Sequence, residues 1–460
     1  MRKTGRPLGS GYDDTAAIGK ILSLMQEEGA TRRSAIIRVC GHDQLRRLEM
    51  KMAARGVVRN EGSMKMTARS VWDLGHRIGV DEGGTTVVLA PKELQGSVLA
   101  LGRDGVDRSS FLLCLARSMI AGGSGLIFID RTGDASLPAR IAEIASALGR
   151  DEDLQIVDFN APAGGSRSFN PFESASTDAL IHTCIELLDY DYADGVIWKG
   201  RAAKMLSAVL SALVWLRDEK GLPLDAGVVR NALDFDAIVG LAADARLPSH
   251  IVKKLKWYLA SLPGFDALQA TQSVSTREQH GYLQMQFSVV LRDLADLDAG
   301  ILRLGCESVA LDEIALRRRI FLVSMPAPTG LNDRDAHVAR FVGASLMAMV
   351  RTLAGKEIPV RSDEDALTER SSDPLFPIVL NGVGEFMTAG MERLAGVARS
   401  HGFCLVLADR SFEDVAERRP RVAEGIIASC RTRIGFGSSG EIELVQGDRS
   451  RRLTPVQTDA

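Results

Sequence analysis

Hydrophobic and polar positions follow three different rhythms along the 460 residues of the chain. In the first 80 residues, apolar side chains recur at helical spacing in short runs that end at glycines. Further on, short apolar runs typical of buried strands alternate with helical segments, which predicts a parallel α/β sheet. Long helical periodicity interrupts this alternation and predicts an inserted all-α domain, with helices at 176–189, 196–217, 248–261 and 274–297.

Strands are expected on both sides of the insertion, at 85–90, 97–101, 126–130, 155–159, 319–324, 377–380, 403–407, 431–436 and 441–446. One α/β core, split by helices and preceded by a small helical head, accounts for this order. The predicted domains are a basic helical domain at 1–80, an α/β core at 81–174 and 301–448, an all-α domain at 175–300, and a flexible tail at 449–460.

Charge is divided unevenly between these regions. The formal net charge is −3, yet residues 1–80 hold 15 Lys and Arg against 8 Asp and Glu. A basic head indicates contact with an anionic polymer, and three short helices with a glycine-containing turn are typical of a helix-turn-helix. We therefore predict DNA contacts by Arg6, Arg46, Arg47, Lys51 and Arg55. The alternative is a solvated helical appendage with a disordered tail.

Composition excludes several classes of protein. No segment approaches the roughly 18 consecutive apolar residues of a membrane helix, and the first residues lack the apolar core of a signal peptide. The six cysteines are scattered without a C-x-x-C pair, and the seven histidines form no metal-binding pattern. We expect a cytoplasmic protein with no membrane span and no metal site.

The segment after the strand at 97–101 stands where a phosphate-binding loop belongs, but it departs from the pattern G-x-x-x-x-G-K-[ST]. Two positions differ from this pattern: Asp107 replaces the second glycine and Arg108 replaces the lysine. A carboxylate at 107 repels a phosphate about 4 Å away by roughly 1 to 4 kcal/mol. Arginine is also a bulkier donor than lysine. The candidate nucleotide- or phosphate-binding residues are Gly102, Gly105, Asp107, Arg108, Ser109 and Ser110. Weak binding of an anion by Arg103 and Arg108 is left open.

A nucleotide motor also needs an acidic pair at the end of a later strand, one acid for Mg²⁺ and one to activate water. The strand at 377–380 is followed instead by Asn381 and Gly382, and Glu385 is the acid that follows. Two independent defects in one site predict that the chain does not hydrolyse ATP. ATP and Mg²⁺ are therefore doubtful cofactors.

Several strings in this order resemble the type IV secretion coupling proteins, the TraG/TraD-like motors, and among them the Dot/Icm-type and IncI-plasmid branch. They are GLIFIDRTGD at 125–134, FNPF at 169–172, WKGRA at 198–202, YLASLPG at 258–264, EQHGYLQMQF at 278–287 and ARSHGF at 398–403. The resemblance covers about 95–437. It implies a RecA/FtsK-like P-loop NTPase fold with an inserted all-α domain, behind the small helix-turn-helix-like head.

The same resemblance implies hexameric or membrane-tethered assemblies that use ATP and pass DNA–relaxase or effector substrates to a secretion channel. This chain departs from the family in its two altered nucleotide motifs, in lacking an N-terminal membrane anchor, and in carrying Arg410 where the family has a sensor glutamine. Arg431 and Arg433 are candidates for a trans-acting arginine pair.

Three hypotheses follow. The chain is a non-catalytic coupling-protein paralogue that binds DNA and relaxosome or coupling partners, or a diverged but active DNA-translocating ATPase. The third is a subunit of a mixed ring with an intact coupling ATPase. In each case it acts in the cytoplasm, at the inner membrane through its partners.

Overall fold

The computed structural model describes residues 76–454, apart from gaps at 82, 90–93, 95–96, 103–104, 162–165, 189–192, 297–308, 329–332, 354–374, 389–390, 393–401, 418, 438–440 and 447–448. The chain divides into two compact units between Ser70 and Val71. The predicted head, with the DNA contacts Arg6, Arg46, Arg47, Lys51 and Arg55, lies outside the described residues.

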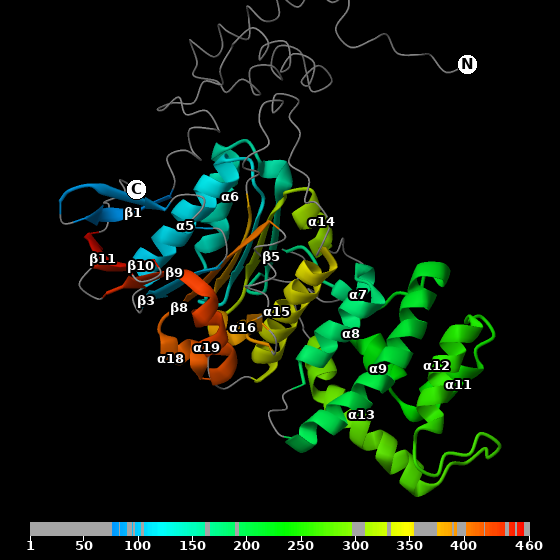
Figure 1. The fold of residues 1–460 in the computed structure, drawn as a ribbon. Helices are drawn as coiled ribbons and strands as arrows, with labels where there is room; N and C mark the ends of the chain where they lie inside the picture. Colours follow the sequence, from blue (N-terminus) through cyan, green and yellow to red (C-terminus); the bar gives the residue numbers. More distant parts are fainter. Residues whose placement is uncertain are drawn as a thin grey trace, which may run out of the picture. The chain divides into compact units, whose positions relative to one another are not determined.

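Eleven strands of the described residues form one sheet in the order β2-β1-β11-β10-β9-β3-β8-β7-β4-β6-β5 (Figure 1). The parallel part runs from one side to the other as β9 (Cys430–Phe436), β3 (Ser97–Gly102), β8 (Phe403–Asp409), β7 (Phe376–Asn381), β4 (Leu126–Asp130), β6 (Ile320–Ser324) and β5 (Leu154–Asp158). Antiparallel pairing then extends one edge through β10 (Ile442–Gln446), β11 (Arg449–Thr454), β1 (His76–Asp81) and β2 (Thr86–Leu89).

The central strands are buried on both faces, which is why they are continuous apolar runs. Successive side chains point to opposite faces, so Phe128 and Ile127 belong to different cores. One core lies under α5 (Gly105–Ala121) and α6 (Leu137–Ala147). The other lies under α14 (Leu311–Leu316), α15 (Asp333–Leu353), α16 (Val383–Phe386), α18 (Phe412–Ala416) and α19 (Pro420–Ser429).

The insertion between β5 and β6 is helical, as predicted. It contains α7 (Pro171–Ser174), α8 (Thr177–Glu186), α9 (Ala193–Lys220), α10 (Ala226–Ala232), α11 (Phe235–Ala243), α12 (Ser249–Ala260) and α13 (Val274–Ala295). Ser176, Asp225, Asp234 and Ser273 each accept a backbone N–H at a helix start, the N-cap role these side chains favour. The short helices α10 and α11 had not been predicted.

Polar side-chain contacts hold this domain together and join it to α15. The Nε2–H of His280 donates to the Leu233 carbonyl at 3.0 Å, which leaves Nδ1 to accept from the Tyr258 hydroxyl at 2.7 Å. At the junction with α15, His337 Nδ1 lies 2.7 Å from a carboxylate oxygen of Asp293. These contacts fix α13 both within its own domain and against the core.

Two predicted boundaries differ from the structure. β1 begins at His76, inside the segment expected to be helical, and β11 occupies 449–454, where a flexible tail was expected. In β11 the residue Leu453 alone is buried, so its sequence lacks the apolar alternation of a half-buried strand. Pairing with β10 and β1 orders it instead. No helix of the described ranges is long and apolar enough to cross a membrane.

Candidate functional site

The candidate site lies at the carboxyl ends of four neighbouring parallel strands. Register pairs Leu101 of β3 with Asp409 of β8, and Asn381 of β7 with both Ala408 of β8 and Asp130 of β4. The ends of these strands therefore meet at one edge of the sheet, where α/β proteins bind ligands. The predicted residues Gly102 and Asn381 are brought to this edge together.

The connection from β3 to α5 is short. The strand ends at Gly102 and α5 begins at Gly105, the fourth position of the phosphate-loop pattern. The backbone N–H groups of residues 105–107 therefore lack intrahelical acceptors, while Ser109 and Ser110 follow in the second turn. Asp107 is described only as part of the α5 backbone. A Cβ at Gly102 would lie 2.6 Å from that of Phe436, so packing alone requires this glycine.

Arg108 turns back toward the strand it follows. Its side chain is 3% exposed, and Nη1 donates to the Gly102 carbonyl at 2.6 Å. Burial lowers the pKa of this guanidinium, and the charges of Asp409 and Asp130 oppose that shift. The cation therefore interacts with this chain's own carbonyl and carboxylate groups, in the position where the pattern places a lysine for phosphate.

Asn381 and Asp130 form a buried pair. The Asn381 amide donates to a carboxylate oxygen of Asp130 at 2.6 Å, and the Thr132 hydroxyl donates to the same carboxyl group at 2.9 Å. Burial raises the pKa of Asp130, while the hydrogen bonds from Thr132 and Asn381 oppose the shift. Asn381 Oδ1 is buried with no hydrogen-bond partner among the described residues. An amide here satisfies Asp130 and offers no charge to a metal ion.

Gly382 makes a side chain at the next position unfavourable. Its φ is +86°, and an added Cβ would lie 3.1 Å from that of Arg131. An acid here would need both the left-handed conformation and a movement of Arg131. Glu385, the predicted substitute, is half-buried on α16.

Asp409 and Arg410 complete the edge. The Asp409 carboxylate accepts the backbone N–H groups of Gly384 and Arg410, both at 2.8 Å. Burial raises the pKa of Asp409, and these two hydrogen bonds oppose the shift. The Arg410 guanidinium turns away to Asp414 at 2.8 Å.

Asp130 and Asp409 were not predicted as site residues. Each is an acid that ends an otherwise apolar strand, LIFID in β4 and FCLVLAD in β8. That signal is visible in the sequence, because an acid at the carboxyl end of a parallel strand reaches the ligand-binding edge.

Arg431 and Arg433 are exposed on one face of β9. In the sheet order β9 lies beyond β3, away from Asn381 and Asp130. The Arg433 side chain donates to the Cys430 carbonyl at 3.3 Å. The structure does not bring this pair together with the buried strand-end residues.

The residues at the strand ends do not fit Mg²⁺ and a nucleoside triphosphate. Magnesium sites in such motors use a strand-end carboxylate, and here that position is an amide donating to Asp130. The phosphate position receives the Arg108 guanidinium, bonded to Gly102.

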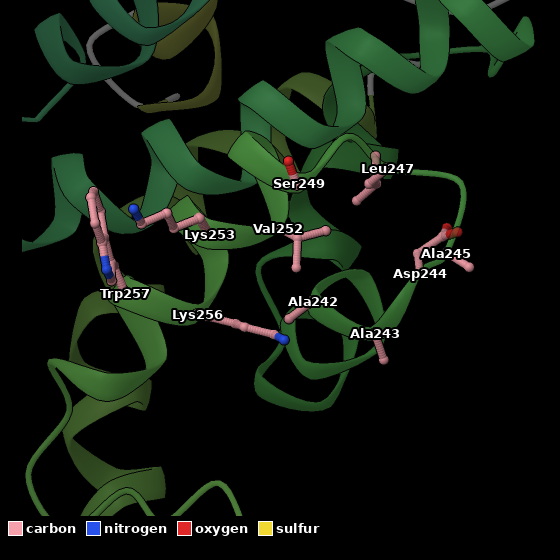
Figure 2. A pocket seen from close by; sticks show the side chains of 10 residues that line it. All are labelled: Ala242, Ala243, Asp244, Ala245, Leu247, Ser249, Val252, Lys253, Lys256 and Trp257. Atoms are coloured by element: carbon pink, nitrogen blue, oxygen red, sulfur yellow. The ribbon is translucent and has the colours of Figure 1, made fainter.

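A pocket lies in the all-α domain, between the end of α11 and the start of α12 (Figure 2). Its volume is about 650 Å³, and its lining includes Ala242, Leu247, Val252, Lys253, Lys256 and Trp257. Trp257 is 63% exposed, and the Lys253 ammonium lies 4.8 Å from the centre of its indole ring. The sequence signal for this pocket is the run KKLKW at 253–257, whose lysines and tryptophan were not predicted as site residues.

Known proteins resemble this chain in sequence and in fold, although no protein-family model matches it. The type 4 coupling protein DotL of Legionella pneumophila is 26% identical over 377 residues, which cover 76% of this chain and 48% of DotL. The chain thus spans about half the length of this curated relative.

Solved structures of the conjugative coupling protein TrwB share the fold. The unbound form has a TM-score of 0.55 at 10% identity, covering 85% of this chain and 91% of that one. The complex with ADP and Mg²⁺ has a TM-score of 0.51 at 13% identity, covering 84% and 83%. The predicted RecA-like P-loop NTPase fold of the α/β class is confirmed. Over about three quarters of its length the chain is therefore similar in sequence to a type 4 coupling protein, and it shares its fold with a conjugative coupling protein.

Proposed function

We propose that this chain is a coupling component of type IV secretion or conjugative DNA transfer that does not hydrolyse ATP. The observation that carries the proposal is the buried Arg108 guanidinium, which donates to Gly102 in the place of a phosphate-binding lysine. The Asn381–Asp130 hydrogen bond and the left-handed Gly382 support it from the opposite side of the site. In this proposal the motor fold acts as a scaffold.

Phosphate release from ATP with Mg²⁺ tests the first half of the proposal. We expect release at the rate of a protein-free control. The alternative is a diverged ATPase in which Arg108 replaces the lysine and Glu385 the missing acid. Turnover abolished by Ser109→Ala, together with Mg²⁺-dependent binding of a fluorescent ATP analogue, would establish that alternative and end this proposal.

DNA is the proposed anionic partner, bound through the basic head and through the exposed face of α12. Lys253, Lys254, Lys256 and Trp257 are exposed there, and an exposed indole beside lysines is a stacking surface for bases next to phosphate contacts. Mobility shifts with duplex and single-stranded DNA at 50 and 200 mM salt should show binding that weakens with salt.

Two variants separate the contributions to DNA binding. Deleting residues 1–60 should weaken binding to both DNA forms if the head binds. Trp257→Ala should weaken binding to single strands more than to duplex, because only unpaired bases can stack on the indole. Salt-insensitive binding, or binding unchanged by both variants, would reject the DNA assignment.

We further propose that the chain works at the cytoplasmic side of the inner membrane with relaxosome or secretion-system proteins, among them an intact coupling ATPase in a mixed ring. The exposed Arg431 and Arg433 of β9 support the mixed ring, since paired guanidinium groups can reach a phosphate in a neighbouring subunit. Co-purification with such an ATPase, and loss of its stimulation on Arg431→Ala and Arg433→Ala, is the expected result. An ATPase whose rate ignores both variants would remove this role.

A further inference from the structure

An apolar stripe runs along the outside of α13. Val274, Tyr282, Met285 and Val289 recur at spacings that place them on one face of the helix, and all four are large exposed hydrophobic residues. Met285 is 64% exposed. Apolar side chains scattered singly on a surface are ordinary, but Tyr282, Met285 and Val289 follow one another over two turns of this face, and such a cluster marks an interaction surface.

The start of α9 continues this stripe. The Trp198 ring meets the Tyr282 ring edge-on with centroids 6.3 Å apart, and Ile197 beside it is 68% exposed. The strings WKGRA and EQHGYLQMQF, which no nucleotide site explains, are thus neighbours in the fold. The α9–α13 face is defined here as Ile197, Trp198, Gly200, Arg201 and Lys204 with Val274, Gly281, Tyr282, Met285 and Val289.

Two glycines on the α9–α13 face are not required by the described fold. Gly200 and Gly281 lie inside helices, neither has a positive φ, and a Cβ added at either would meet no atom within 4 Å. Glycine is less favourable than alanine inside a helix, so these positions lower the stability of the domain. A glycine on an exposed helix face also lets another backbone approach closely.

The α9–α13 face carries basic side chains, so a partner with complementary charge is acidic. The Arg201 guanidinium lies 5.5 Å from the centre of the Trp198 ring, and Lys204 is exposed one turn further along α9. Arg292 is exposed at the far end of the α13 stripe, beside Asp293, and Glu278 is the acid on the same side of that helix. The α9 end of the face is therefore positive.

We propose that the α9–α13 face docks an amphipathic helix of a partner protein, with acidic residues opposite Arg201 and Lys204 and small residues where it crosses Gly200 and Gly281. Residues 274–292 span about 27 Å of helix, so a partner helix of about 18 residues matches the stripe. Helices bind helical proteins in this way through apolar residues at i, i+3, i+4 and i+7. The inference depends on neither nucleotide nor DNA binding.

The probe is a stapled synthetic helix of about 18 residues with a leucine stripe, alanines at the crossing positions and glutamates on both flanks. Its matched control replaces each glutamate by lysine. Fluorescence anisotropy against the full chain should show the acidic helix binding at least tenfold more tightly than the basic one. Met285→Glu should abolish that binding, while Phe412→Glu, an equivalent change at an exposed residue of α18, should leave it unchanged.

Replacing the two glycines gives a second test, because a glycine that served only the fold would not affect both the Tm and the affinity for the helix. Gly200→Ala and Gly281→Ala should each raise the Tm of the free protein and weaken the acidic helix several-fold. A lowered Tm, or unchanged affinity in both variants, would overturn the proposal. Equal affinity for the two helices would also overturn it. Self-association of the wild type that is abolished by Met285→Glu would overturn it as well, since a second copy of this chain would then be the occupant.

Discussion

Replacing Asn381 by Asp restores one acid of the pattern that a nucleotide motor needs, and we expect it to destabilise this protein. In the native chain the Asn381 amide donates to the Asp130 carboxylate at 2.6 Å, and both side chains are buried. The variant sets two carboxyl groups at this separation. Two unit charges 2.6 Å apart repel by about 6 kcal/mol at an effective dielectric constant of about 20. The pair is therefore expected to keep one proton at neutral pH.

The free energy of keeping that proton sets the size of the effect. An unfolded aspartate has a pKa of about 3.9, and holding its proton costs about 1.4 kcal/mol for each pH unit above that value. The destabilisation by Asn381→Asp is thus at most about 4 kcal/mol at pH 7 and about 1.5 kcal/mol at pH 5. Burial already raises the pKa of Asp130 in the same direction. Because the pKa of the folded pair lies above the unfolded value, stability is complete below about pH 4 and is lost as pH rises through the folded pKa.

Thermal unfolding of the wild type and Asn381→Asp between pH 4.5 and 7.5 measures this effect. The Tm difference should grow with pH until the folded pair has titrated. Asn381→Ala is the matched control, since it removes the amide donor without adding a carboxyl group and its Tm loss should vary less with pH. A loss independent of pH would refute the paired-carboxyl reasoning. Recovery of the Tm of Asn381→Asp by Mg²⁺ and ATP would show that the strand ends accept nucleotide after all.

Three further changes test separate parts of the account. Arg108→Ala removes the buried donor to Gly102 and should cost about 1.5–3 kcal/mol of unfolding free energy, seen as a lower Tm, without creating nucleotide affinity in a fluorescent-ATP titration. Burial lowers the pKa of His280, so the neutral imidazole stabilises the fold, and this contribution should be lost as pH falls from about 6.5 through the folded pKa. In His280→Gln the Tm should lose that pH dependence between pH 5 and 8. Gly382→Ala, at a φ of +86°, should cost about 1–2 kcal/mol in urea unfolding, and Gly382→Asn less, since Asn tolerates the left-handed conformation.

The fold was largely predictable because its central strands carry a strong signal. β4, β6, β7 and β8 are buried on both faces, and such strands appear as uninterrupted apolar runs. The edge was less predictable, because β11 buries Leu453 alone and is ordered by its neighbours. The helices α10 and α11 were missed because they are short, and their caps Asp225 and Asp234 lie in segments without a long period.

The candidate site was predictable in position but not in its contacts. The pattern located Arg108, Asn381 and Gly382, since each replaces a residue of known role. It gave no indication that Asp130, far away in the sequence, accepts the Asn381 amide, or that Arg108 bonds to Gly102. The Asn381–Asp130 contact depends on strand order, because β4 and β7 become neighbours only in the folded sheet.

Three of the altered positions, 108, 381 and 382, are compatible with one another in a way that a single reversion is not. An acid at 381 loses the amide that satisfies Asp130, and an acid at 382 meets a left-handed backbone and Arg131. A lysine at 108 has no planar fork to reach back to Gly102 as the guanidinium does. Changes at 381 and 108 each disturb a buried hydrogen bond, whereas a change at 382 strains the backbone, and a double change at 108 and 381 leaves that strain in place. The strand-end edge is therefore costly to change one position at a time, which agrees with the proposed role of this fold as a scaffold.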